Sequence, residues 1–358
     1  MIVDRIILKN FRSYDYVDTK LDKGLNIIVG ENGSGKSNLA EAIHYLSLGK
    51  SFRTINDKEL VKIGKDIASI DAFTHRGETK NQIKIVLSKE NKTILINSKK
   101  VKKLSSLSGV MNVIIFKPSD VNIYKGAPSN RRKLIDIAIS KQDDIYLDNL
   151  TNYNKILKER NELLKSDTVD KIYLDVLDTQ ISELALSISR CRDRYIKSIN
   201  EILNKVLLKL TDEKEQLTLV YHPFVDLKDT NKKEVKNLYN SYLDSDIKNK
   251  STTIGPHRED FTMYLGDKDI SKYGSQGQNR IAAIALILTP YFLIQNVDKK
   301  PVVILDDVLS ELDAVHQKKL LTLASKLQQC IITATNISKH GEAIIYEIKN
   351  NKITRREP

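Results

Sequence analysis

The motif that most constrains this chain is GENGSGKS at residues 30–37, which matches G-x-x-x-x-G-K-[ST] in full. The apolar segment GLNIIVG precedes it, and NLAEAIHYLSLG follows it with helical periodicity. In a strand–loop–helix context the glycines allow backbone N–H groups to surround phosphate oxygens, and the helix N-terminus adds a positive dipole. The sequence therefore predicts an α/β nucleotide-binding core. The residues expected to form its phosphate loop are Gly30, Glu31, Asn32, Gly33, Ser34, Gly35, Lys36, Ser37 and Asn38.

The chemistry expected at this loop needs a second motif, PVVILDD at residues 301–307. Lys36 is expected to reach the β- and γ-phosphates, and Ser37 to supply a hydroxyl to Mg²⁺. An apolar strand delivers Asp306 to bind Mg²⁺, directly or through water, and Asp307 to orient or deprotonate the attacking water. Adjacent acids after a strand also occur in turns and helix caps. The phosphate loop favours the metal-site interpretation.

The two motifs must contact one nucleotide although most of the chain separates them. Between about residues 120 and 250 the pattern changes from strands to helices. Spacings of three and four residues there indicate two helices that fold back on each other as an antiparallel coiled coil. The seam residues expected on these helices are Leu150, Tyr153, Leu157, Leu164, Leu177, Ile181, Leu184, Ile188, Cys191, Tyr195 and Ile202. We therefore expect a discontinuous head (residues 1–119 and 251–358) and an inserted helical arm (residues 120–250).

The composition limits the classes of partner. The formal net charge of +12 suits nucleic acid or an anionic membrane face, although a generally Lys-rich composition would give the same sum. No run of about eighteen apolar residues is present, so no membrane span is expected. The first residues, MIVDRIILKNF, lack the pattern of a secretory signal. Two cysteines without metal-ligand spacing indicate a reducing compartment, so a cytoplasmic protein is expected.

Five segments together carry a family resemblance: GENGSGKSNLAEAIHYLSLGKSFRT, KGAPSNRRKLID, TTIGPHRED, YGSQGQNR and LDDVLSELD. In this order and over nearly the whole chain they resemble the RecF family. These bacterial recombination and repair proteins belong to the ABC-type ATPase superfamily and are related to SMC heads. The resemblance implies an ABC-type head whose mixed sheet carries an antiparallel β subdomain. ABC transporters and SMC heads usually have Glu where this chain, like RecF proteins, has Asp307, so slow hydrolysis is expected.

The resemblance also implies a site shared between two subunits. Its signature motif is Ser275, Gln276, Gly277 and Gln278, which caps the γ-phosphate held by a second subunit. Ser310 and Asp313 resemble the D-loop that crosses such an interface, and Asp313 also suits a helix N-cap. Either Thr333 or Thr335 falls where a γ-phosphate sensor is expected.

Other residues have two readings each. Arg12 either contacts the nucleotide or is a surface arginine. Four residues either contact DNA or brace the fold: Arg131, Arg132, His257 and Arg258.

Pro290 is expected to bend or break its helix near Ile287.

The functional expectation is an ATP-driven homodimer that uses ATP and Mg²⁺. It would bind double-stranded DNA at gaps and single-strand/duplex junctions, with weak, DNA-stimulated ATP hydrolysis releasing the DNA. The resemblance implies RecR, with RecO, as partners in loading RecA, and a nucleoid-associated location. Two alternatives are a non-hydrolysing scaffold at the replication fork and an SMC-like chromosome protein, for which the arm is short.

Overall fold

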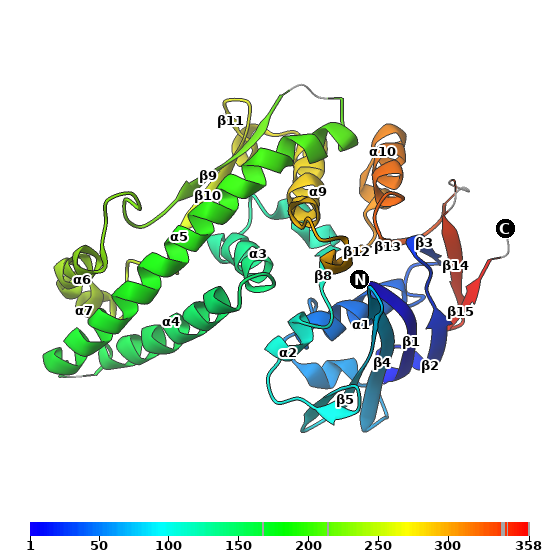
Figure 1. Ribbon diagram of the computed structural model, residues 1–358, viewed down its shortest axis with the longest axis horizontal. Helices are drawn as coiled ribbons and strands as arrows, with labels where there is room; N and C mark the ends of the chain where they lie inside the picture. The colour runs from blue at the N-terminus through cyan, green and yellow to red at the C-terminus, as the bar shows by residue number, and fades with distance from the viewer. Residues whose placement is uncertain (167, 213–214, 338–340, 342, 357–358) are drawn as a thin grey trace. The chain divides into compact units, whose positions relative to one another are not determined.

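The computed structural model describes residues 1–166, 168–212, 215–337, 341 and 343–356. It divides into two units, each continuous in space but not in sequence (Figure 1). The first comprises Met1–Val121, Lys205–Lys214 and Gln276–Pro358, and the second comprises Asn122–Asn204 and Glu215–Ser275. The expected division placed residues 251–275 in the head and 205–214 in the arm. The second unit retains residues up to 275 because β10 (Asp260–Leu265) pairs with β9 (Leu217–His222).

The first unit contains an antiparallel six-stranded sheet in the order β2-β1-β4-β5-β6-β7. Its strands are β1 (Ile2–Phe11), β2 (Tyr14–Lys20), β4 (Ile67–Arg76), β5 (Thr79–Ser88), β6 (Lys92–Ile96) and β7 (Lys99–Lys100). Alternate residues of β4, among them Ala68, Ile70 and Ala72, are buried. One face of the sheet therefore packs on the core, as the period-2 pattern predicts.

A second six-stranded sheet of the same unit has the order β15-β14-β3-β13-β12-β8. Its strands are β3 (Gly24–Val29), β8 (Val113–Phe116), β12 (Val302–Leu305), β13 (Gln329–Ala334), β14 (Ile344–Lys349) and β15 (Lys352–Arg355). All neighbours are parallel except β14 and β15. Every residue of β12 and β13 is buried, as expected of inner parallel strands. The carboxyl ends of β3, β13 and β12 thus lie side by side.

Helix α1 (Lys36–Leu48) contacts β8 and β13 of one sheet and β1 and β4 of the other, so it lies between the two sheets. The remaining helical elements of this unit are α2 (Ser105–Ser108), α9 (Gln276–Leu293), α10 (Ala314–Ala324), η1 (Asp57–Leu60), η3 (Val297–Lys299) and η4 (Leu309–Glu311), with η2 (Pro118–Asn122) at its boundary. Helix α9 continues through Pro290 to its end, so the expected break near Ile287 is absent. Pro290 lies in the last turn, where the missing N–H costs one hydrogen bond.

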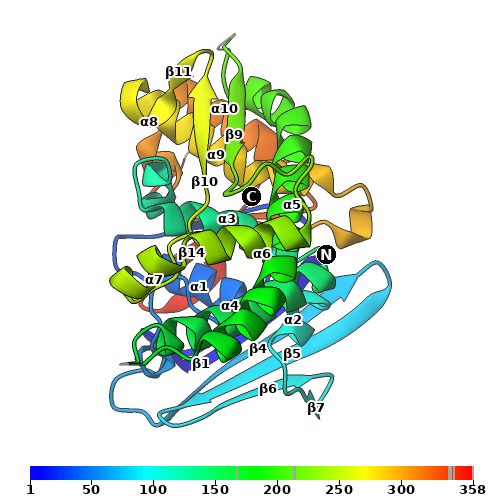
Figure 2. The same cartoon turned by 90° about the vertical axis from the view of Figure 1, so that its left-hand side faces the viewer.

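The second unit consists mainly of helices with a three-stranded antiparallel sheet, ordered β11-β10-β9 (Figure 2). Its helices are α3 (Pro128–Ser140), α4 (Asp144–Leu163), α5 (Lys171–Leu210, which continues into the first unit), α6 (Lys232–Ser241), α7 (Leu243–Asn249) and α8 (Ile270–Tyr273), and β11 is Lys268–Asp269. Helices α4 and α5 form the expected hairpin, with Asn149 Nδ2 donating to Ser187 Oγ (3.1 Å).

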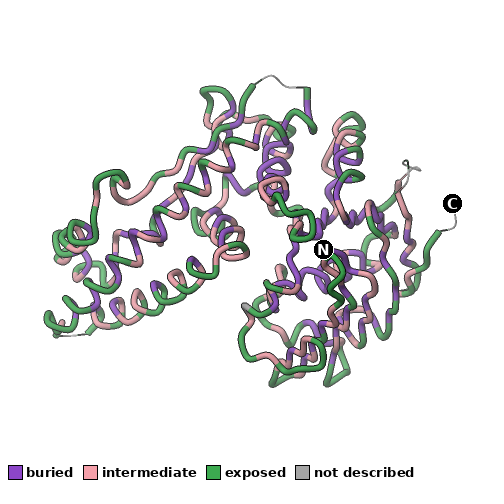
Figure 3. The backbone as a smooth tube through the Cα atoms, in the orientation of Figure 1, coloured by how far each residue is buried: buried purple, intermediate pink, exposed green. Residues whose placement is uncertain are grey.

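The buried face of α5 differs from the seam expected from its apolar spacing (Figure 3). Leu177, Ile181 and Ile188 are buried, but Leu184, Cys191 and Tyr195 are only half-buried. Polar residues share the buried face: Asp178, Ser182, Ser189 and Arg192. Asp178, Ser189 and Arg192 are tolerated there because each has hydrogen-bond partners from elsewhere in the unit, which a hydrophobic pattern does not reveal. The Ser182 hydroxyl donates to the carbonyl oxygen of Asp178, one turn earlier on α5.

Within the described ranges, no helix has both the length and the apolar character required to cross a lipid bilayer.

Candidate nucleotide-binding site

The backbone of the phosphate loop requires glycine at two positions. A Cβ at Gly30 would lie 2.7 Å from Ser34 Oγ and 2.8 Å from the carbonyl oxygen of Ile348. Gly35, which caps α1, has φ 108°, and its carbonyl oxygen accepts a hydrogen bond from the Tyr14 hydroxyl (2.9 Å). Tyr14, the first residue of β2, therefore holds the loop in a conformation that side chains at Gly30 and Gly35 would disrupt.

Lys36 occupies the concave side of the loop. Its Nζ donates to the carbonyl oxygens of Gly30 (2.6 Å) and Glu31 (2.8 Å), and the residue is only 7% exposed. Burial lowers the pKa of Lys36, while the charges of Asp307 and Asp306 act in the opposite direction. An ammonium group is thus already positioned where an anion held by the loop would meet it.

Asp306 brings three segments of the sequence together. Its Oδ1 accepts hydrogen bonds from Ser37 Oγ (3.0 Å) and Thr333 Oγ1 (2.7 Å). Burial raises the pKa of Asp306, and these two hydrogen bonds oppose that effect. A carboxylate beside a hydroxyl is an oxygen donor pair of the kind that Mg²⁺ prefers.

The neighbouring Asp307 has a strained backbone, with φ 51°. Its N–H donates to Thr333 Oγ1 (2.9 Å). Its Oδ1 is buried and has no hydrogen-bond partner in the described part of the chain. Thr333 thus contacts both aspartates, whereas Thr335 is exposed. Of the two threonines considered as a γ-phosphate sensor, Thr333 is thus the one beside the aspartates.

Arg12 lies in a network that sequence reasoning did not include. Glu41, fully buried on α1, accepts from Arg12 Nε (2.9 Å) and Nη2 (2.7 Å). Arg53 lies 3.5 Å from the same carboxylate and donates to Asn38 Oδ1 (2.8 Å). Arg12 is therefore an anchored residue and not a free surface arginine. Arg53 belongs to the SFRT segment, which carries part of the family resemblance. This segment was the sequence feature that could have pointed to Arg53 as a residue of the site.

The signature and D-loop residues lie mostly at the surface. Ser275, Gln276 and Gly277 are exposed, and Gln278 is half-buried at the start of α9. Arg280, the fifth residue of this helix, forms an ion pair with Glu311 (2.6 Å).

On the D-loop, the Ser310 hydroxyl donates to the carbonyl oxygen of Asp307 (2.9 Å). Asp313 caps α10 by accepting from the N–H groups of Val315 and His316. The N-cap interpretation of Asp313 therefore holds.

The four candidate DNA-contacting residues belong to the second unit, and three of them, Arg131, Arg132 and His257, are engaged in contacts within it. Arg131 is 8% exposed and donates to both oxygens of Asp260 (2.7 and 2.6 Å), and Arg132 donates to the carbonyl oxygen of Glu259 (2.7 Å). His257 lies 2.6 Å from the Tyr153 hydroxyl, and burial lowers its pKa to about 4. A neutral imidazole offers no charge to a phosphate. Arg258 is exposed.

The fold and the site define a class: an ABC-type ATPase head with a phosphate loop, a parallel strand ending in two aspartates, and a helical insertion. The family model described as RecF/RecN/SMC N terminal domain matches residues 2–353. The chain belongs to the RecF family of DNA replication and repair proteins.

Individual relatives support this assignment. The chain is 37% identical to the DNA replication and repair protein RecF of Clostridium tetani, over 98% of this chain and 99% of that protein. It is 39% identical to that of Lachnospira eligens, over 95% and 94%. The solved structure of the recombination mediator protein RecF–ATPrS in the RecFOR pathway matches with a TM-score of 0.90 and 32% identity, over 99% of this chain and 98% of that one. An Smc head bound to the C-winged helix domain of ScpA matches with a TM-score of 0.61 at 17% identity, which supports the fold alone.

Proposed function

We propose that this chain is an ATP-dependent DNA-binding protein of recombinational repair and replication restart. The observation that supports this best is the meeting of Ser37, Asp306 and Thr333 beside the phosphate loop, with Lys36 inside the loop. These residues come from three distant segments, and together they are the set that a Mg-triphosphate requires. The similar RecF structures with ATP and ATPrS support the same ligand.

In this proposal Lys36 exchanges its loop carbonyl partners for the β- and γ-phosphates. Ser37 and Asp306 hold Mg²⁺, which when bound neutralises phosphate charge and orients the nucleotide. Asp307 uses its unpartnered oxygen to orient or deprotonate the attacking water, and Thr333 holds both aspartates in place. Because the Asp307 side chain is short, hydrolysis is slow and serves as a timer.

The second half of the site comes from another copy of the chain. Ser275 to Gln278 lie at the N-terminus of α9, where backbone N–H groups and the helix dipole favour an anion. They complete the γ-phosphate site of the partner copy, and Ser310 and Asp313 cross the same two-fold interface. ATP binding thereby closes the dimer, and hydrolysis opens it.

The DNA-binding surface is basic, in keeping with the net charge of +12, and reads phosphates more than bases. We propose gaps and single-strand/duplex junctions as its targets, with RecR and RecO as partners in loading RecA. Arg131 and His257 are left out of this surface because they are committed inside the second unit.

Ser275→Arg tests the shared site. The larger, charged side chain blocks the approach of the signature loop to the partner's nucleotide but leaves the chain's own phosphate loop untouched. We expect ATP affinity within about twofold of wild type and no ATP-driven dimer at micromolar concentration, measured by light scattering with and without gapped duplex.

The matched control is Ser325→Arg, which adds the same side chain at the exposed C-terminal cap of α10 and should dimerise normally. ATP-driven dimers of the Ser275 variant would contradict the shared site.

Asp307→Asn tests the catalytic role. The amide keeps the size of the side chain but cannot accept a proton, so turnover should fall at least about 100-fold. ATP binding should persist and a stable ATP dimer should accumulate on DNA, measured by filter binding and phosphate release. Asp229→Asn, at an exposed position of the second unit, is the control and should leave turnover unchanged. Unchanged turnover in the Asp307 variant would move the catalytic role to another residue.

A further inference from the structure

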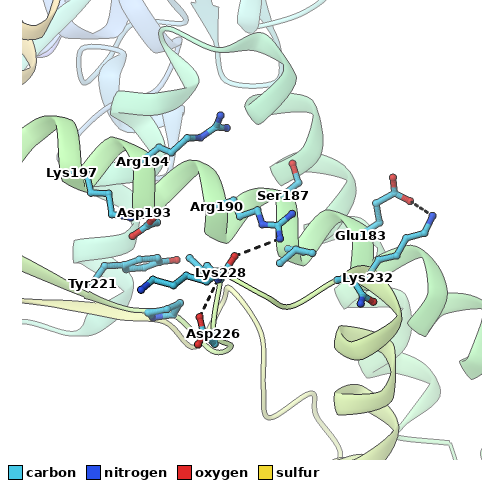
Figure 4. Close-up of a pocket in the computed structure, with 14 residues that line it drawn as sticks. Glu183, Ser187, Arg190, Asp193, Arg194, Lys197, Tyr221, Asp226, Lys228 and Lys232 are labelled. Carbon is cyan, nitrogen blue, oxygen red and sulfur yellow. Dashed lines mark hydrogen bonds and ion pairs between the residues drawn. The ribbon is translucent and has the colours of Figure 1, made fainter.

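A groove of about 840 Å³ lies in the second unit, between α5 and the connection from β9 to α6 (Figure 4). It takes no part in the proposed nucleotide site, whose residues other than Ser275 belong to the first unit. Four apolar or partly apolar side chains line it: Leu186, Tyr221, Pro223 and Leu227. Its charged lining residues are Arg190, Arg194, Lys197, Lys228, Lys232, Glu183, Asp193 and Asp226.

The cations of this groove are only partly neutralised. Lys197 pairs with Asp193 (2.7 Å), and Lys232 lies 3.8 Å from Glu183. No carboxylate lies within 4.0 Å of the charged groups of the other three cations among the described residues. These three are Arg190, Arg194 and Lys228. The groove therefore has an excess of positive charge beside apolar side chains.

Arg190 is fixed in its orientation. It extends from α5 toward the connection and donates to the carbonyl oxygen of Thr230 (2.8 Å) (Figure 4). A positioned guanidinium loses less conformational entropy on binding an anion than a freely rotating one.

The strand beside the groove leaves part of its edge open. The side-chain amide of Asn204 on α5 forms hydrogen bonds with both the N–H and the C=O of Leu217 on β9. The side-chain amide of Asn200 does the same with Leu219. Strand alternation places the main chain of Tyr221 next along this edge. Ile196 lies one turn before Asn200 on α5, and its apolar side chain cannot form the corresponding hydrogen bonds. Among the described residues, no side chain forms a hydrogen bond with the main chain of Tyr221. The main chain of Tyr221 is therefore without a side-chain partner among the described residues, and Tyr221 itself lines the groove.

These features fit a peptide better than a nucleic acid. A phosphate backbone carries closely spaced negative charges and would be repelled by the three carboxylates in the lining. A peptide can place acidic side chains only where the unpaired cations lie and apolar side chains against Leu186 and Leu227. Its main chain can also pair with Tyr221, as in other edge-strand recognition.

We propose that this groove docks an extended acidic segment of a partner protein. Carboxylates of the segment bind Arg190, Arg194 and Lys228, its apolar side chains pack on the apolar lining, and its backbone pairs with Tyr221.

The test measures binding of a defined probe to the full chain by fluorescence anisotropy. The probe is a fluorescein-labelled dodecapeptide in which Asp-Leu-Glu-Phe is repeated. A peptide with lysine in place of each acid and a single-stranded thymidine dodecamer are measured alongside. We expect the acidic peptide to bind in preference to the lysine peptide. Replacing Lys228→Glu together with Lys232→Glu should weaken this binding at least about tenfold, because two attractive charges become repulsive.

The double variant should fold, since Lys232 is the first residue of α6, where glutamate complements the helix dipole. The control Lys165→Glu with Lys248→Glu changes the same charge at two exposed positions outside the groove and should bind like wild type. Equal peptide affinity in the groove variant, or no preference for the acidic peptide, overturns the proposal. If the groove variant loses only its binding of the oligonucleotide and still binds the acidic peptide, the proposal is also overturned, and the groove is assigned to nucleic acid.

Discussion

Lys36→Ala is expected to lower ATP affinity at least about 100-fold, close to the limit of detection. The Nζ of Lys36 lies 2.6 Å from the Gly30 carbonyl oxygen, inside the loop that would hold the phosphates. Removing it leaves the charge of the β- and γ-phosphates without its direct partner in a partly desolvated site, where charge-assisted hydrogen bonds are strongest. The loss of affinity is measured from the equilibrium binding of a labelled ATP analogue, monitored by calorimetry.

Lys50→Ala is a suitable control because Lys50 is exposed and lies just beyond Gly49, the C-cap of α1. This variant should retain wild-type affinity. The circular dichroism spectrum of the Lys36 variant should match that of wild type, since Lys36 bonds only loop carbonyls. Normal nucleotide affinity in this variant would contradict the phosphate-loop assignment.

Arg160→Ala is expected to destabilise the second unit by about 3–5 kcal/mol. Arg160 is fully buried and donates to Asp178 (2.6 Å), Asp246 (2.7 Å) and the hydroxyl of Thr252 (2.8 Å). Without the guanidinium, two carboxylates remain buried and lose their cation. Burial already raises the pKa of Asp178, so this carboxylate has little solvation to replace the lost contact. Urea denaturation followed by circular dichroism measures the change in the free energy of unfolding.

Two further variants separate the charge effect from a packing effect. Arg160→Met with Asp178→Leu removes one buried pair together and should recover part of the loss relative to Arg160→Ala. Arg194→Ala removes an exposed arginine of α5 and should change stability by less than about 0.5 kcal/mol. Wild-type stability of Arg160→Ala would show that this network does not hold the unit together.

The parts of the site that sequence reasoning located share a local character. The phosphate loop, the strand ending in Asp306 and Asp307, and the cap at Asp313 each depend on a few consecutive residues, so a short pattern identifies them. The proximity of Ser37 to Asp306 could also be expected from the sequence, because both residues must lie close together to bind one nucleotide.

Other parts depend on contacts between distant segments. The position of Thr333 beside the two aspartates depends on the register of β13 beside β3 and β12, which the sequence does not show. Glu41 looked like an ordinary polar residue of a helix, and only the tertiary structure shows it buried against Arg12 and near Arg53.

The sequence alone determined the class of fold, the family, and the order of motifs along the chain, because these are carried by local periodicity and by short runs of glycine, lysine and aspartate. The tertiary structure decided which polar residues are buried: Arg131, Arg160, Arg192 and Glu259 look like surface residues in the sequence. Their partners lie far away along the chain, and burial of a charge is stable only when those partners arrive. A pattern of neighbouring residues does not show which distant residues come into contact. These networks are therefore seen only in the folded chain.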